Sequence, residues 1–294
     1  MHLKGGGPTM FDAKRGRNDL KKFLATVKNR RSPPDCEIQE RAANVFNQYC
    51  KLLCQFRDSP LSVEDIFPVD PQIIIKHILQ INYHEVDMIE GYEEFMEGQK
   101  SMTQIAGLID RDEDQIVISK KFKAEWRRYT AAHEIAHWLL HPEVIHLRER
   151  PVENGPGLES GRGRERGRNI YLRERPITGH ELAYNKRPPV ERQADLFAAE
   201  LLMPTRHLVK TFFKRFGGPL NMSRPNEEIE FWFSVRGELG CKSDKSAKKK
   251  LRTRSMLVAN DVSFGGALLP SLAERYGVSP TAMAIQLETL RLVS

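Results

Sequence analysis

The sequence predicts an α+β fold, in which a small, mostly antiparallel sheet packs on two helices and the chain is helical at both ends. Three observations lead to this prediction. Apolar side chains recur at helical spacing in residues 126–141 and 190–204. Residues 102–119 have the pattern of a β-hairpin. Residues 271–292 have the pattern of two short helices joined by a glycine-containing turn.

Composition and charge indicate a soluble globular protein. The chain has 294 residues, of which 40% are hydrophobic and 29% are charged. It lacks an apolar run of the ~20 residues that cross a bilayer, and its first residues lack the apolar core of a secretory signal. We therefore expect a cytoplasmic protein without membrane contact. The net charge of +7 permits contact with nucleic acid or with an acidic protein and identifies neither.

The N-terminal region is basic and is expected to be helical. A short helix is predicted at residues 18–28, and a firmer one at residues 36–56, where apolar residues follow helical spacing. The four Cys form no C-x-x-C pair, and we expect buried, reduced thiols. The i, i+4 spacing of Cys50 and Cys54 would also permit metal binding.

A second unit is expected to begin at Leu61 with a helix and a strand. Asp70 followed by Pro71 is a good helix start, and the helix is predicted to continue over residues 73–79. Residues 82–86 are predicted to form the first strand. We expect His84 to be exposed or hydrogen-bonded rather than to bind a metal.

The predicted hairpin pairs residues 102–110 with residues 115–119. Its acidic turn, residues 110–114, lacks the glycine and alternating ligands of a calcium loop, so a solvated turn is the better interpretation. The hairpin runs almost directly into the helix at 126–141. We therefore expect a sheet edge beside that helix, where an extended peptide could add as a strand.

The helix at residues 126–141 contains His133, Glu134 and His137 in the pattern H-E-x-x-H. Residues four apart lie on one helix face, so the two imidazoles can bind one metal ion, and Glu134 can reach a metal-bound water as general base. Two hydrogen-bonded core histidines are the alternative. That alternative is disfavoured, because burying two imidazoles beside a carboxylate is costly. His141 continues the row one turn further, where we expect it to be exposed or to contact a ligand.

A third ligand must come from another segment. Glu191 begins the helix at 190–204 and can point inward, and Asp195 one turn later can accept the ring N–H of a ligating His. Glu200 is the competing candidate, and an ordinary acidic residue at a helix N-terminus is the alternative interpretation of Glu191. The longer H-E-x-x-H-x-x-G-x-x-H pattern is excluded by Leu140 and Glu143.

A Gly- and Arg-rich insert at residues 152–170 separates the two helices and is expected to be flexible. It could be a lid, a nucleic-acid-binding arm or a passive surface loop, and we favour the last. The sequence LRERP occurs on both sides of it, at 147–151 and 172–176. His180 and Tyr184 follow, and either could donate a hydrogen bond to an oxyanion or simply pack.

The C-terminal region combines helices with a basic run. A helix is predicted at 208–216 and a short core element at 228–235. The basic run at 242–254 is expected to be a solvated face or linker, with phosphate contact as the alternative. The final helix pair is rich in Ala and Met, with Gln286 and Arg291 as its few polar candidates. We therefore expect packing or protein docking rather than base readout.

Several of these segments resemble the ImmA/IrrE family of metallo-endopeptidases. The resemblance lies in RRYTAAH (127–133), HEIAHWLLH (133–141), ERQADLFAAELLMP (191–204) and LAERYGVSPTAMAIQL (272–287). It implies a zincin-like fold and a cytosolic, gluzincin-like protease that cleaves a helix-turn-helix repressor as a stress, phage or mobile-element switch. The matching residues would be His133, His137 and Glu191 as ligands and Glu134 as base. Zinc is the default metal for such ligands, and manganese or iron could replace it.

Three regions are therefore expected. These are a basic helical segment at 1–60, a zinc metallopeptidase domain at 61–215 and a C-terminal helical region at 216–294. The expected activity is hydrolysis of a peptide bond in a protein substrate. The alternative is a regulator that binds DNA or protein, with a structural or vestigial metal site.

Overall fold

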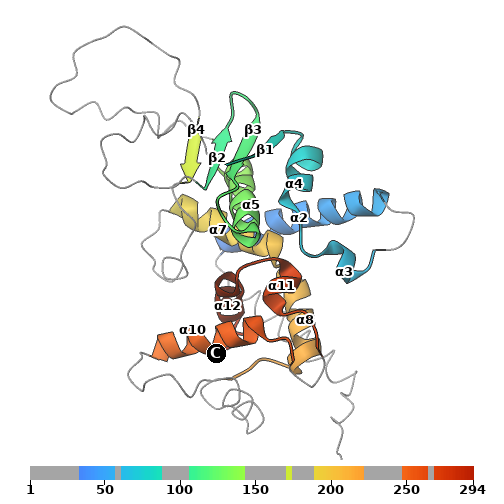
Figure 1. The fold of residues 1–294 in the computed structure, drawn as a ribbon, viewed down its shortest axis with the longest axis vertical. Coiled ribbons are helices and arrows are strands. Elements are labelled where there is room, and N and C mark those ends of the chain that lie inside the picture. Colours follow the sequence, from blue (N-terminus) through green and yellow to red (C-terminus); the bar gives the residue numbers. More distant parts are fainter. Residues whose placement is uncertain are drawn as a thin grey trace, which may run out of the picture. The chain divides into compact units, whose positions relative to one another are not determined.

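The computed structural model describes residues 33–56, 61–87, 106–142, 170–173, 189–221, 247–263 and 268–294. These residues form two compact units, which we consider separately. The sheet unit comprises Glu37–Leu202 and Tyr276–Ser279. The helical unit comprises Met203–Arg275 and Pro280–Ser294, with residues 33–36 grouped with it. The described elements are α+β, as predicted (Figure 1).

Helix α2 (Pro33–Gln55) confirms the helix predicted at 36–56. It begins at a proline, which the first turn of a helix tolerates. One face of it is buried, through Ile38, Ala42, Val45, Phe46 and Tyr49. Cys54 is exposed, so the expectation that its thiol is buried was wrong. Cys36, Cys50 and Cys54 are all free thiols.

Short capped helices lead into the sheet. Helix α3 (Val63–Ile66) begins with a capping box between Ser62 and Asp65. Helix α4 (Pro71–Ile73) is capped by the Asp70 carboxylate, as predicted, and continues as the π-helical η1 (Ile74–Leu79). The predicted helix over 73–79 is therefore present, with wider turns than an α-helix.

The sheet has the order β1-β3-β2-β4, formed by β1 (Asn82–Val86), β2 (Gly107–Asp110), β3 (Gln115–Ser119) and β4 (Ile170–Arg173). The β2–β3 hairpin and the β2–β4 pair are antiparallel, whereas β1 runs parallel to β3, so the sheet is mixed. We expected the hairpin at a sheet edge. It is central instead, because β4 pairs with the outer side of β2.

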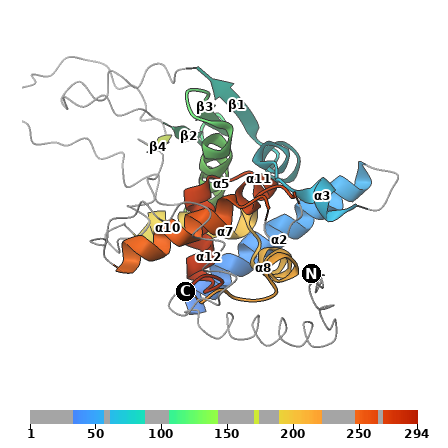
Figure 2. The same ribbon diagram turned by 60° about the horizontal axis from the view of Figure 1, so that its bottom comes forward.

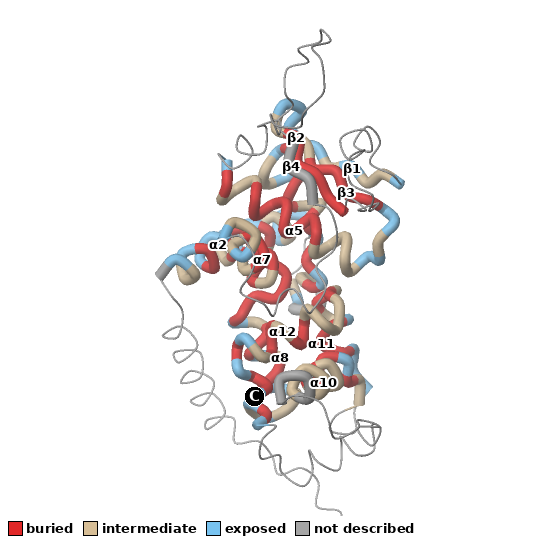
Figure 3. Tube along the Cα trace, turned by 90° about the vertical axis from the view of Figure 1, so that its left-hand side faces the viewer, coloured by how far each residue is buried: buried red, intermediate tan, exposed pale blue. Residues whose placement is uncertain are grey.

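Two helices form the buried centre of the sheet unit. Helix α5 (Ala124–Leu140) packs against β2, β3 and helix α7 (Pro189–Leu202). Figure 3 shows α5, α7, β2 and β3 largely buried. The predicted apolar stripe of α7 is fully buried, at Ala194, Phe197, Ala198, Leu201 and Leu202. Local apolar periodicity therefore predicted both helices and the faces that they bury.

The helical unit contains α8 (Thr205–Phe216), α10 (Ala247–Asn260), α11 (Leu272–Tyr276, its last residue in the sheet unit) and α12 (Pro280–Thr289). In Figure 2, α10 lies across α12. Arg252 on α10 forms a bidentate ion pair with Glu288 on α12, at 2.7 and 2.8 Å. Part of the predicted basic run is thus a packed helix rather than a linker.

The predicted pair of C-terminal helices is confirmed. Gly277 joins α11 to α12 with a φ of 60°, a conformation that glycine adopts without strain. Gln286 is buried, and Arg291 is exposed. The helix predicted at 18–28, the insert at 152–169, the core element at 228–235 and the start of the basic run at 242–246 lie outside the described residues. None of the helices in the described ranges combines the length and apolar character that a bilayer crossing demands.

Candidate metal centre

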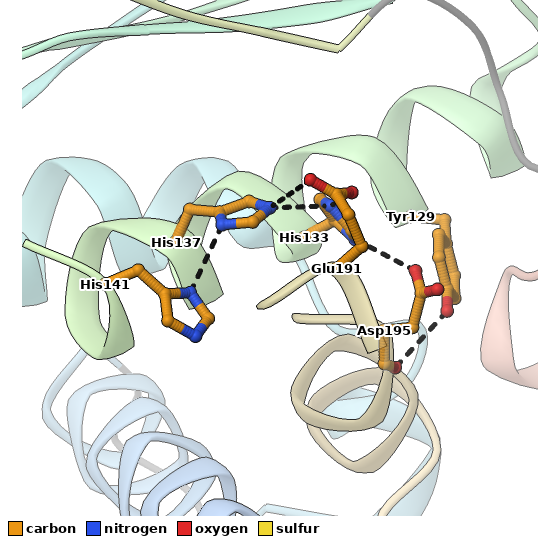
Figure 4. A network of polar contacts seen from close by, with 6 residues as sticks. All are labelled: Tyr129, His133, His137, His141, Glu191 and Asp195. Atoms are coloured by element: carbon orange, nitrogen blue, oxygen red, sulfur yellow. Dashed lines mark hydrogen bonds and ion pairs between the residues drawn. The ribbon is translucent and has the colours of Figure 1, made fainter. Parts of the chain in front are cut away.

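Helix α5 places two imidazoles side by side at the centre of the sheet unit. His133 and His137 are one turn apart and essentially fully buried. Their Nε2 atoms lie 2.9 Å from each other (Figure 4). The i, i+4 spacing predicted that both rings could bind one metal ion, and both do present their Nε2 atoms to one point.

Glu191, in the first turn of α7, brings a carboxylate to the same point. Its Oε2 lies 3.3 Å from His133 Nε2, and its Oε1 lies 3.7 Å from His137 Nε2. In the part of the chain that the structure describes, these three residues are the one group of His, Cys, Asp and Glu arranged to hold a metal ion. All their ligand atoms lie within 4.8 Å of one another.

The spacing of these donor atoms fits a tetrahedral cation. Bonds of ~2.0–2.1 Å from zinc to nitrogen and oxygen place tetrahedral ligand atoms about 3.3–3.4 Å apart. The observed separations of 2.9, 3.3 and 3.7 Å bracket that value. Two His and one Glu also form a donor set known from catalytic zinc sites, in which a fourth position is left for water or substrate.

Asp195 fixes the orientation of His133. Its Oδ1 lies 3.0 Å from His133 Nδ1, and its backbone oxygen accepts a hydrogen bond of 3.3 Å from the Tyr129 hydroxyl. An ionised carboxylate only accepts, so His133 donates from Nδ1 and keeps the lone pair on Nε2. The expected contact between Asp195 and a histidine of the motif is present, and it directs the free nitrogen toward Glu191.

His141 contacts His137 from the opposite side. Its Nδ1 lies 3.2 Å from His137 Nδ1, and its Nε2 lies 2.8 Å from the side-chain oxygen of Gln193. Burial lowers the pKa of His141, and the hydrogen bond to Gln193 opposes that effect. The sequence predicted that His141 would be exposed or contact a ligand, and the structure places it in contact.

Glu134, the expected general base, is fully buried. Its side chain lies where α5 contacts the sheet. A Cβ atom added to Gly107, at the start of β2, would be only 3.1 Å from Glu134 Oε1. Glycine at this position thus lets the strand approach the carboxylate closely.

Arg111, in the hairpin turn, holds the C-terminal end of α5. Its Nη2 donates to the backbone oxygens of His137 and Trp138, at 3.3 and 2.8 Å. The guanidinium also lies 4.3 Å from the centroid of the Trp138 ring. A cation here stabilises the negative end of the helix dipole beside His137. The sequence does not predict this role for Arg111, because the acidic turn around it indicates only solvation.

The remaining candidates do not join the site. Glu200 is buried on α7 but is not part of the three-residue group. His84 is exposed on β1, as expected. His180 and Tyr184 lie outside the described residues. The contact of Gln193 with His141 could not be predicted, because no local sequence pattern marks a polar residue two positions after Glu191.

No protein-family model matches the chain, and a search of curated proteins also found no match. The described residues define an α+β protein with a buried His/His/Glu group suited to a metal ion.

Proposed function

We propose that this protein is a zinc-dependent endopeptidase, which hydrolyses a peptide bond in a protein substrate. The convergence of His133, His137 and Glu191 on one point, with Glu134 beside His133 on the same helix, carries the proposal. The resemblance of the two helices to the ImmA/IrrE family supports it, although no family model matches.

The residues divide the catalytic work. His133, His137 and Glu191 would hold the cation, which when bound polarises the peptide carbonyl and lowers the pKa of a coordinated water to about 7. Glu134 takes a proton from the attacking water at its carboxylate and passes it to the leaving amine. Asp195 keeps His133 oriented through the Nδ1 contact of 3.0 Å. The same three ligands would also accept Mn²⁺ or Fe²⁺.

A helix-turn-helix repressor is the substrate that the family resemblance suggests. Such a substrate would need an extended segment at the cleavage site, because a protease must reach the main chain. Of the described strands, the sheet edges are β1 and β4, so main-chain pairing would take place on one of these two strands, or on β2 if β4 were displaced. We expect the metal-bound protein to act as a stress-, phage- or mobile-element-linked switch.

Glu134→Gln tests the mechanism, because the amide keeps the shape of the side chain and loses its basicity. A mixture of peptides derived from a whole proteome is the probe, and new N-termini are counted by mass spectrometry. We expect zinc-loaded wild type to generate them, and Glu134→Gln to bind equal zinc and cleave about 10²–10⁴-fold more slowly. Equal cleavage by the variant, or none by zinc-loaded wild type on peptides and on purified helix-turn-helix repressors, would contradict the proposal.

A regulator that binds DNA through the C-terminal helices has weaker support. Gln286, the polar candidate on α12, is buried. Arg252, in the basic run, is engaged by Glu288 within the helical unit. Charge reversal of Arg291, the exposed remaining candidate, would distinguish the two functions. It should leave cleavage unchanged and would abolish binding to duplex DNA only if the regulator interpretation is correct.

A further inference from the structure

We propose that Gln193 and His141 form a hydrogen-bonded relay that fixes the tautomer of His137 and so makes it a metal ligand. The inference rests on the proposed metal centre and assigns positioning roles to two residues outside the ligand set. Its basis is a continuous chain of contacts on the far side of His137 (Figure 4 shows the His141–His137 part).

The direction of the relay follows from its first member. The side-chain oxygen of Gln193 can only accept, so His141 donates from Nε2 across 2.8 Å. A neutral imidazole with its proton on Nε2 has a lone pair on Nδ1, which accepts from His137 Nδ1 across 3.2 Å. His137 then has its lone pair on Nε2. That atom is the one that faces His133 Nε2 and Glu191.

The opposite direction would disable the ligand. If the Gln193 amide presented its NH₂ group to His141, every donor and acceptor along the chain would exchange. His137 would then carry its proton on Nε2, pointing at the place where a cation must sit. The side chain of Gln193 therefore selects between a ring that binds metal and a ring that repels it.

The two histidine ligands are thus supported in different ways. His133 contacts a carboxylate that is only an acceptor, whereas His137 is supported by an uncharged chain. A second carboxylate behind His137 would add negative charge close to Glu191 and Glu134. An uncharged relay orients the ring without that added charge. It does so only when the oxygen of the Gln193 amide, and not its nitrogen, faces His141.

Gln193→Met and Gln193→Glu form a matched pair that tests the relay. Methionine keeps the length of the side chain and removes the acceptor, whereas glutamate keeps an acceptor that cannot reverse. We expect Gln193→Met to bind zinc about 10–100-fold more weakly, as measured by competition with a chelator. Gln193→Glu should bind no more weakly than wild type. Arg192→Met, at the exposed neighbouring position on α7, should leave the affinity unchanged.

A second measurement reads the tautomer directly and needs neither activity nor metal. Two-dimensional ¹H–¹⁵N spectra of the imidazoles in the metal-free protein distinguish a proton on Nδ1 from one on Nε2. We expect the Nδ1–H form for His137 in wild type and Gln193→Glu, and a shift toward the Nε2–H form in Gln193→Met. Circular dichroism of the same samples checks that each variant is folded.

The outcomes separate the two proposals. A wild-type protein that binds no metal overturns the proposed function, while the spectra of the metal-free protein still decide the relay. Wild-type zinc affinity in Gln193→Met with an unchanged His137 tautomer would overturn the relay and leave the metal centre intact. An equal loss of affinity in Gln193→Glu would also overturn it, because the effect would then be one of shape.

Discussion

Replacing Gly107 with alanine tests the close approach of β2 to α5, on which the position of Glu134 depends. A Cβ at this position would lie 2.7 Å from Thr130 Cγ2, 3.1 Å from Glu134 Oε1 and 3.2 Å from Ile118 Cδ1. Non-bonded carbon atoms normally rest ~3.5–4.0 Å apart, so the added methyl overlaps its neighbours.

The cost follows from how little those neighbours can move. Thr130, Glu134 and Ile118 are all buried, and close-packed interiors resist displacement. Overpacking of this kind costs about 1–3 kcal/mol in the free energy of unfolding. We expect Gly107→Ala to fall in that range. Because the methyl also contacts the Glu134 carboxylate, the variant should lose peptide cleavage while it still binds zinc.

Denaturant unfolding measures the effect, with Gly218→Ala as the matched control. An added Cβ at Gly218 meets no heavy atom within 4 Å, so that variant should be as stable as wild type. Thr130→Ser removes the methyl that lies closest to the new Cβ, and combining it with Gly107→Ala should restore part of the lost stability through a coupling of about 0.5–3 kcal/mol. A Gly107→Ala protein with wild-type stability would refute the close approach of strand and helix.

Three further predictions follow from single side chains. Glu191→Ala should remove metal from the purified protein, as measured by elemental analysis, whereas Glu200→Ala should retain it; the reverse result would move the third ligand to Glu200. Arg111→Met should lower the free energy of unfolding by about 1.5–3 kcal/mol, because charged hydrogen bonds to the end of α5 are lost, and an unchanged thermal midpoint would contradict this. Arg215→Met removes the guanidinium that binds the fully buried Asp261, and should lower the free energy of unfolding by about 3 kcal/mol, with partial recovery in the combined Arg215→Met and Asp261→Asn variant. A combined variant no more stable than Arg215→Met alone in denaturant unfolding would contradict this.

Local sequence patterns predicted most of the helices, because an apolar stripe records the face that a helix buries. The stripe of α7 is a clear case, with Phe197 and Leu201 among its fully buried members. Helix caps could also be predicted from the sequence, because the residues that form them are neighbours in the chain. Asp70 caps the N-terminus of α4, and Pro71 is the first residue of that helix. The His133–His137 pair also belongs to this class, because its spacing alone places both rings on one face.

Glu191, the third member of the candidate metal group, could not be assigned from local sequence patterns alone. Glu191 and Glu200 both lie on α7, and Glu200 is the more deeply buried of the two. They lie nine positions apart, which is about 14 Å along a helix axis, so only one of them can reach the histidines. Which one does so depends on how α7 is positioned along α5. That position is set by packing between residues more than fifty apart in sequence, and no local pattern encodes it.

The sheet is mostly antiparallel, as predicted, because β2 pairs antiparallel with both β3 and β4. The parallel pairing of β1 with β3 escaped prediction for the same reason as the position of α7. The residues of a segment such as β1 can predict that it forms a strand. They do not specify which strand it pairs with, or whether that pairing is parallel or antiparallel. The placement of β4 against β2 likewise depends on a segment far along the chain. Arg111 and Gln193 are ordinary polar residues in their local sequence. Only the fold brings Arg111 to the C-terminal end of α5 and Gln193 to His141.

These long-range contacts explain why the motif on α5 can be a site rather than a coincidence of spacing. The helix is in contact with β2 near Gly107, with Arg111 at its C-terminal end and with α7 through Tyr129 and Asp195. Each contact lies within about two turns of His133 or His137, so it constrains the part of the helix that carries them. The three ligand groups therefore meet through packing of the chain itself. A cation entering such a site would not have to organise its donor atoms.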